Sequence, residues 1–229
     1  MKKKKVAIPS LLLLSLSAVL MLIGCISMPV GDKVAVIPLS GAITSGRSSL
    51  IFGPTITPSL VKEQLGRAGQ DMTVKAIVLR VESSSGTVAS CQEILQEIEN
   101  VKRTKPIVVS MGDMAASGGY YISAKADKIV ALPGTLTGSI GVISQIPNVK
   151  GLYDKLGIEI QIFKGGKYKD MYSGLRELTP EEMEITQRMT DEYYEQFVNV
   201  VAEGRGLSKE EVRNLATGQP YTGAEAKKL

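Results

Sequence analysis

The sequence predicts an α/β fold in which a mainly parallel sheet is flanked by helices. Short apolar runs rich in β-branched residues alternate along the chain with segments whose apolar residues recur every three or four positions. Short connections join the two kinds of segment, an order that favours parallel strands linked by helices. The strands are expected at residues 34–39, 76–81, 106–110, 128–132, 142–145 and 159–163.

Helices are expected between these strands and after the last of them. The expected helices cover residues 57–69, 88–102 and 117–125, and a longer helix begins at Thr179. Its start is a capping box, Thr179-Pro180-Glu181-Glu182, with proline at the first helical position. Gly204 and Gly206 end it, and Ser208 with Glu211 indicates a second capping box. The buried stripe of the long helix is expected to comprise Ile185, Met189, Tyr193, Phe197 and Val201.

Composition excludes several classes of function. The 27 Lys and Arg residues outnumber the 23 Asp and Glu residues, but the four lysines at positions 2–5 account for the difference. A basic surface stripe for nucleic acid is therefore not supported. Because the chain has no histidine, a Ser-His-Asp site and metal sites that need imidazole are excluded. We expect no metal and no cofactor.

The first 24 residues have the pattern of an export signal. Four lysines precede an apolar run over residues 6–23, and the segment contains no acidic residue. The run ends in Leu22-Ile23-Gly24-Cys25, which resembles the lipobox of bacterial lipoproteins, so Cys25 is the expected lipidation site. The alternative is an uncleaved signal anchor, because about 20 apolar residues span a bilayer. Both interpretations place the remaining chain on the extracytoplasmic face of the cell membrane.

One domain is expected after the N-terminal segment. Residues 25–33 are predicted to form a tether, and residues 34–229 a single domain. The sequence stops at Leu229 within an apparent helix start, so we expect the native protein to continue further. Cys91 lies on the apolar stripe of the 88–102 helix and is expected to be a buried packing residue, not a nucleophile.

Two junctions between a strand and a helix are candidates for a catalytic site, because backbone amides converge at such junctions. The first is residues 83–87, Ser-Ser-Ser-Gly-Thr, and the second is residues 112–120, which contain Ser117-Gly118-Gly119. Small neighbours would let a substrate approach Ser117, which suits a nucleophile. The competing interpretation is that Ser117 only caps the helix that follows it.

Without histidine, a serine nucleophile needs a lysine as its base. Lysine serves only where burial or a neighbouring cation lowers its pKa. Lys164, Lys167 and Lys169 form a cluster in which mutual repulsion would act in that direction, and spacing alone does not choose among them. The glycine-rich phosphate-binding motifs G-x-x-x-x-G-K-[ST] and G-x-G-x-x-G are absent, so nucleotide binding has no support.

Three stretches resemble a known family. AIVLRVESSSGTVAS, MGDMAASGGYYISAKADKIVALPGTLTGSIGVI and KGGKYKDM are similar to signal peptide peptidase A, a family of membrane-bound Ser/Lys peptidases with a ClpP/crotonase-like fold of repeated β-β-α units. The resemblance implies that Ser117 is the nucleophile and that Lys169, which Asp170 follows, is the general base. It also implies an oxyanion hole formed by the amides of Gly86 and Gly118. The family usually has Asn-Ser-Pro-Gly-Gly where this chain has Glu82-Ser83-Ser84-Ser85-Gly86.

The leading hypothesis is therefore a membrane-tethered serine endopeptidase that hydrolyses signal peptides or other membrane-associated peptides after export. One alternative is an NfeD-type Ser/Lys protease that acts on a membrane scaffold protein. Another is a catalytically weak lipoprotein that binds peptides, which the altered turn at Ser84 and Ser85 would permit. Acyl-CoA chemistry is disfavoured because export separates the chain from cytosolic CoA.

The resemblance also bears on assembly. Double-length members of the family carry the lysine in one half and the serine in the other. A homo-oligomeric ring of this shorter chain would recreate that arrangement, with Ser117 of one protomer facing Lys169 of its neighbour.

Overall fold

The computed structural model describes residues 31–46 and 53–229. The expected export signal at 1–24, Cys25 and most of the expected tether at 25–33 lie outside these residues. In the part of the chain that is described, no helix has both the length and the apolar character needed to cross a bilayer.

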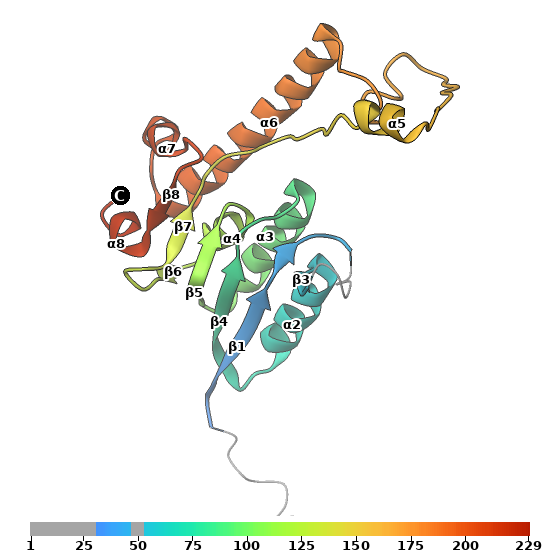
Figure 1. The fold of residues 1–229 in the computed structure, drawn as a ribbon. Helices are drawn as coiled ribbons and strands as arrows, with labels where there is room; N and C mark the ends of the chain where they lie inside the picture. Colours follow the sequence, from blue (N-terminus) through green and yellow to red (C-terminus); the bar gives the residue numbers. More distant parts are fainter. Residues whose placement is uncertain (1–30, 47–52) are drawn as a thin grey trace, which may run out of the picture.

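The fold is built on a six-stranded sheet, shown in Figure 1. Five strands follow the order β1-β4-β5-β7-β8, and β6 pairs with the first part of β5. The pairs are parallel except β7 with β8, so the prediction of a mainly parallel sheet is confirmed. The strands are β1 (Lys33–Ser40), β4 (Val74–Ser83), β5 (Ile107–Ala116), β6 (Lys128–Val130), β7 (Leu136–Gly138) and β8 (Pro220–Thr222). A separate parallel pair joins β2 (Ala42–Ile43) to β3 (Thr55–Ile56).

Helices α2 (Pro58–Gln70) and α3 (Val88–Lys102) lie side by side next to β1 and β4 (Figure 1). Burial alternates along β4, where Ile77, Leu79 and Val81 are fully buried and Arg80 is exposed. One face of the sheet therefore forms the core with these helices. Cys91 is buried on the apolar stripe of α3, as its spacing predicts.

The remaining helices follow β5 in the chain. They are α4 (Gly118–Ser123), α5 (Lys150–Leu156), α6 (Pro180–Arg205), α7 (Lys209–Leu215) and α8 (Gly223–Ala226). Both predicted capping boxes, at Thr179 and at Ser208, are present. The end of α6 packs on the core, where the ring centroids of Phe197 and Tyr121 are 5.0 Å apart.

Residues 142–193 project from this body and are called the arm. They comprise an extended segment, α5, a loop and the first part of α6, which runs back toward the sheet (Figure 1). The predicted stripe of α6 is buried only at its end, at Phe197 and Val201, whereas Met189 in the arm is exposed. The arm therefore presents apolar surface that the described part of the chain does not cover.

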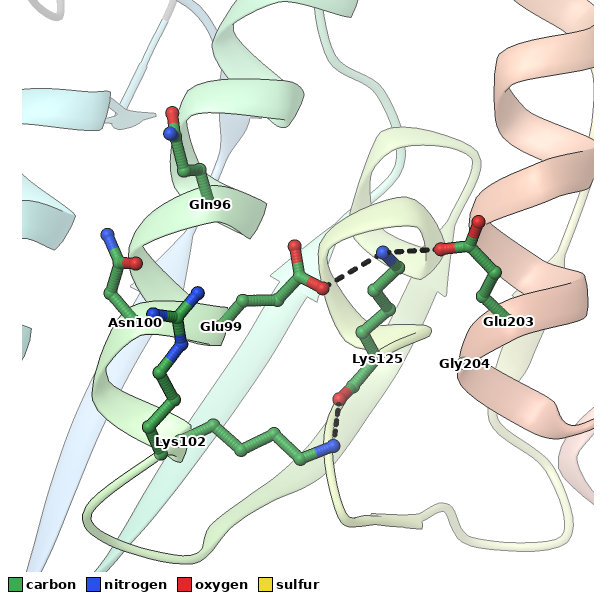
Figure 2. Close-up of a pocket in the computed structure, with 8 residues that line it drawn as sticks. Gln96, Glu99, Asn100, Lys102, Lys125, Glu203 and Gly204 are labelled. Atoms are coloured by element: carbon green, nitrogen blue, oxygen red, sulfur yellow. Dashed lines mark hydrogen bonds and ion pairs between the residues drawn. The ribbon is translucent and has the colours of Figure 1, made fainter.

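Figure 2 shows the root of the arm, where the end of α6 meets α3 and the turn after α4 around a cleft of about 640 Å³. The Lys125 Nζ atom lies 2.9 Å from Glu99 Oε1 and 2.8 Å from Glu203 Oε2. Arg205 donates to the carbonyl oxygens of Ala124 and Ala126 at 2.9 and 3.2 Å. These contacts fix the direction in which α6 leaves the body.

Two predicted strands, at residues 142–145 and 159–163, are not strands in the structure. A strand needs a neighbouring backbone to satisfy its amides and carbonyls, and both segments lie in the arm, where the described chain pairs no strand with them. The sequence missed β2, β3, β7 and β8, because each has only two or three residues and shows no periodic pattern, whereas the equally short β6 lies in the longer apolar run at 128–132.

Met111 and Met72 offer a matched test of the core. The Met111 residue is 2% exposed on β5, whereas Met72 is 87% exposed. Met111→Ala should lower the free energy of unfolding by about 2–5 kcal/mol, because it leaves a cavity in the core. Met72→Ala should change it by less than about 0.5 kcal/mol. Urea unfolding of both variants checks this, and equal losses would contradict the described core.

Candidate active site

Ser117 occupies a strained turn between β5 and α4. Its backbone angles are φ 50° and ψ −118°, a conformation that residues other than glycine rarely adopt. The Ser117 amide donates to the Gly138 carbonyl at 2.8 Å, and the Ser117 carbonyl accepts from the Tyr121 amide at 2.8 Å. The hydroxyl makes no capping hydrogen bond, so capping is not the role of this side chain. A sharp strand-to-helix turn exposes the nucleophilic serine of enzymes with the α/β-hydrolase fold.

The turn at Gly86 lies directly against this serine turn. A Cβ atom at Gly118 would be 2.6 Å from the Gly86 nitrogen and 2.8 Å from its Cα. A Cβ atom at Gly86 would be 2.4 Å from Cys91 Sγ. Such approaches are too close for any side chain, so both positions require glycine. The structure thus brings together Ser117, Gly118 and Gly86, three of the predicted site residues.

The Gly86 turn is held in place by β2. The Ile43 amide donates to the Ser85 carbonyl at 3.0 Å, and the Ile43 carbonyl accepts from the Thr87 amide at 2.9 Å. The Ser83 hydroxyl also donates to the Ser85 carbonyl, at 3.2 Å. Because Ile43 binds the residues on either side of Gly86, the Gly86 amide points away from β2. Within the described residues, the Gly86 and Gly118 amides have no recorded acceptor and can serve a substrate oxygen.

Cys91 supports this site as a packing residue. Its thiol lies 3.9 Å from the Gly118 carbonyl, and burial raises the pKa of the thiol to about 12. A thiol with so high a pKa stays protonated at neutral pH and is a poor nucleophile.

Glu82 shapes the end of β5, a role that the sequence analysis missed. The pairing of β4 with β5 is interrupted between Val81 and Ser83, where β5 bulges. The Glu82 carboxylate accepts from the bulge amides of Asp113 at 2.7 Å and Met114 at 3.0 Å. Glu82 stands where the resembled family usually has asparagine, and its carboxylate binds two amides at once. The replacement of asparagine by glutamate at this position was therefore the signal in the sequence that could have indicated the role of Glu82.

The three candidate lysines lie in the arm, in the segment between α5 and α6 (Figure 1). Within one chain this segment is remote from β5 and α4, so the structure does not bring Lys169 to Ser117. Lys164 Nζ binds the Asp170 carboxylate at 2.5 Å, and Lys167 pairs with Glu181. Lys169 is exposed, and no acceptor for its ammonium is recorded among the described residues.

Mutual repulsion of these lysines was expected to lower their pKa values, but for Lys167 the structure indicates the opposite shift. Its hydrogen bond to the Glu181 carboxylate raises the Lys167 pKa, which stabilises the charged form. An ion-paired lysine of this kind is a poor proton acceptor. Asp170 pairs with Lys164 and Arg176, not with the adjacent Lys169.

The sheet topology and the strained serine turn define an α/β protein with a ClpP-like fold. Among solved structures, the chain is similar to a ClpP1 mutant from Listeria monocytogenes, with a TM-score of 0.53 and 18% sequence identity. That likeness covers 84% of this chain and 85% of the other, and it confirms the predicted fold.

The model of peptidase family S49 matches residues 99–229. A protein of Synechocystis sp. assigned as a protease is 38% identical over 86% of this chain and 67% of its own length. One of Enterococcus faecium, assigned as a signal peptide peptidase SppA, is 38% identical over 85% of this chain and 57% of its own. Protease 4 of Haemophilus influenzae is 38% identical over 86% of this chain and 32% of its own.

The chain belongs to peptidase family S49, which confirms the family that the sequence motifs resemble. It spans between about a third and two thirds of the length of these relatives.

The strain at Ser117 has a measurable consequence. Glycine tolerates positive φ, so Ser117→Gly should give a protein about 1 kcal/mol more stable than Ser117→Ala. Ser110, in the middle of β5, is the matched control, and there glycine should be less stable than alanine by about 0.5–1 kcal/mol. Chemical denaturation measures all four variants. The same order at both positions would contradict a strained serine turn.

Proposed function

We propose that the chain is a membrane-tethered serine endopeptidase in which Ser117 is the nucleophile and Lys169 of a neighbouring subunit is the general base. The observation that carries this proposal is the juxtaposition of Ser117 with the free amides of Gly86 and Gly118. Lys169 is the one member of the lysine cluster without an acceptor in the described part of the chain. Its exposed side chain is therefore available to a group on a neighbouring subunit.

In the proposed reaction, the neutral amine of Lys169 accepts the proton of Ser117 Oγ while Oγ attacks the scissile carbonyl carbon. The carbonyl oxygen becomes negative and receives hydrogen bonds from the Gly86 and Gly118 amides. When the peptide C–N bond breaks, the leaving amine takes the proton from Lys169 and an ester remains on Ser117. Water then hydrolyses the ester by the same steps.

The separation of Lys169 from Ser117 within one chain supports a site shared between subunits. A head-to-tail ring of identical chains would place each arm over the next body. The arm carries uncovered apolar side chains that such a contact would bury, among them Phe163, which is 91% exposed. The segment 159–163 has the alternating pattern of a strand and pairs with nothing in the described chain. A neighbouring backbone could supply its hydrogen bonds.

Signal peptides and other membrane-associated peptides are the proposed substrates. The proposal rests on the export pattern of the first 24 residues and on the relative from Enterococcus faecium assigned as a signal peptide peptidase. An apolar hollow of about 340 Å³ in the arm, between Pro147, Tyr172 and Met189, is consistent with apolar side chains in the substrate.

The altered turn at Ser84 and Ser85 does not favour the weak peptide-binding alternative. Hydrogen bonds from Ile43 and Ser83 hold this turn without the proline and glycine usual in the family. A serine-directed fluorophosphonate distinguishes the two functions, because an activated Ser117 reacts with it and a binding module does not.

Complementation between two inactive variants tests the shared site. Ser117→Ala and Lys169→Ala should each abolish peptide hydrolysis, and a mixture under subunit exchange should regain activity. In an equal random mixture, about one quarter of the interfaces pair an intact serine with an intact lysine. Cleavage of a fluorogenic peptide by each variant and by the mixture measures this, and activity should rise with pH because the base must be neutral.

Lys62→Ala, an exposed lysine on α2, is the control and should keep wild-type activity. A mixture that stays inactive despite proven subunit exchange excludes the shared site. Full activity of Lys169→Ala alone would mean that another residue is the base.

Membrane attachment is tested through the two cysteines. Cys25 should carry lipid in the native host, and Cys25→Ser should leave an unprocessed, unlipidated precursor. Cys91→Ser is the control and should be processed normally, because Cys91 is buried in α3. Mass spectrometry of the membrane fraction measures both variants. An intact N-terminus without lipid in the wild-type protein supports the signal-anchor interpretation instead.

A further inference from the structure

Arg176 lies between two carboxylates in the arm and binds each through two hydrogen bonds. Its Nε donates to Asp170 Oδ2 at 3.0 Å and its Nη2 to Asp170 Oδ1 at 2.9 Å. Its Nη1 donates to Glu182 Oε2 at 2.7 Å and its Nη2 to Glu182 Oε1 at 2.6 Å. A planar guanidinium can bridge two carboxylates in this way, whereas the ammonium of lysine is a point charge.

Both carboxylates are well shielded from water. The side chain of Asp170 is 9% exposed and that of Glu182 is 3% exposed, against 32% for Arg176. Glu182 also accepts from the Thr179 amide at 2.9 Å, which fixes it to the start of α6. Arg176 is therefore the link between the first turn of α6 and the segment that contains Asp170.

The charges in this cluster persist at neutral pH. The Arg176 guanidinium lowers the Glu182 pKa to about 2 and also holds the Asp170 pKa below its usual range. A carboxylate whose pKa is lowered by folding stabilises the folded state above its ordinary pKa. This contribution is lost as the pH falls from the ordinary value of 4.5 toward about 2 for Glu182.

The residues on both sides of Lys169 are tied to the first turn of α6. Lys167 and Tyr168, which precede it, bind the Glu181 carboxylate. Asp170, which follows it, binds Glu182 through Arg176. Lys169 itself lies on the turn between these two anchors and remains exposed. The backbone at Lys169 is thereby fixed, while its side chain is free to meet another group.

We propose that Arg176 is a positioning residue for the base: its bridge between Asp170 and Glu182 holds Lys169 at the end of the arm in the orientation that reaches Ser117 of the neighbouring subunit. This inference rests on the proposed function of Lys169. Loss of the bridge leaves the shielded Glu182 carboxylate without a cation and leaves Asp170 with Lys164 alone, so the Asp170 side of the segment is no longer tied to α6. Because a displacement of about 1 Å can cost on the order of 100-fold in rate, kcat should fall steeply.

Arg176→Met should lower kcat by roughly 100-fold with a much smaller change in KM, because Ser117 and the Gly86 and Gly118 amides lie on the body, away from Arg176. Arg176→Lys keeps the charge but loses the bidentate geometry, so it should recover only part of the activity. Steady-state kinetics with a fluorogenic peptide on the full-length, membrane-derived protein provides both parameters.

Complementation makes the test directional. In the mixture of Ser117→Ala with Lys169→Ala chains, only the Ser117→Ala chain supplies a functional lysine. Arg176→Met added to that chain should reduce the restored activity by roughly 100-fold. The same substitution added to the Lys169→Ala chain, whose arm presents no lysine, should leave the restored activity unchanged. A general defect in folding or assembly would lower both mixtures equally.

The outcomes separate the two proposals. If the mixture without any change at Arg176 is inactive despite subunit exchange, the shared dyad fails, and the role of Arg176 fails with it. If that mixture is active but Arg176→Met acts equally from either chain, or from neither, only the positioning role is overturned. A loss confined to the lysine-supplying chain supports it.

Discussion

The contact between two glycines, Gly86 and Gly118, is the constraint on which the site depends. Each belongs to a turn that follows a central strand, and the two turns approach so closely that neither position has room for a Cβ atom. Parallel pairing of β4 with β5 brings the ends of both strands to one edge of the sheet. The contact between the two turns therefore places the Gly86 and Gly118 amides beside Ser117.

This constraint fixes the proposed nucleophile and oxyanion hole on the body. The proposed base lies elsewhere, on the arm. The body supplies Ser117 and the two amides. Its tightly packed backbone holds Ser117 at a positive φ. The arm is instead held by ion pairs between side chains. Carboxylates in the first turn of α6 bind the lysine segment on both sides of Lys169. A site divided in this way uses van der Waals packing where atoms must not move and charge pairing where the chain extends beyond its own core.

Local pattern predicted much of the fold and less of the site. The bounds of α3 match the predicted 88–102 helix, and both capping boxes are present, because these signals reside in neighbouring residues. The predictions of strands at 142–145 and 159–163 were wrong, because pairing with a neighbouring strand does not depend on local sequence alone. The sequence placed Gly86 and Gly118 just after their strands, but the contact between them depends on the register of β4 with β5, which local pattern does not set. Likewise, the spacing of the three lysines did not separate Lys169 from Lys164. The family resemblance selected Lys169, and the structure adds that Lys164 pairs with Asp170.

Helix α6 gives the arm the mechanical character of a lever. Its 26 residues make a rod about 39 Å long, with the ion-paired lysine segment at one end and the contacts of Lys125 and Arg205 at the other. A tilt of about 1.5° at the root would displace the far end by about 1 Å, comparable with the tolerance of a reacting pair. Gly204, where a Cβ atom would lie 2.2 Å from the Ala124 carbonyl oxygen, therefore restricts the tilt of α6 and, in the proposed site, would affect the position of Lys169 from a full helix length away.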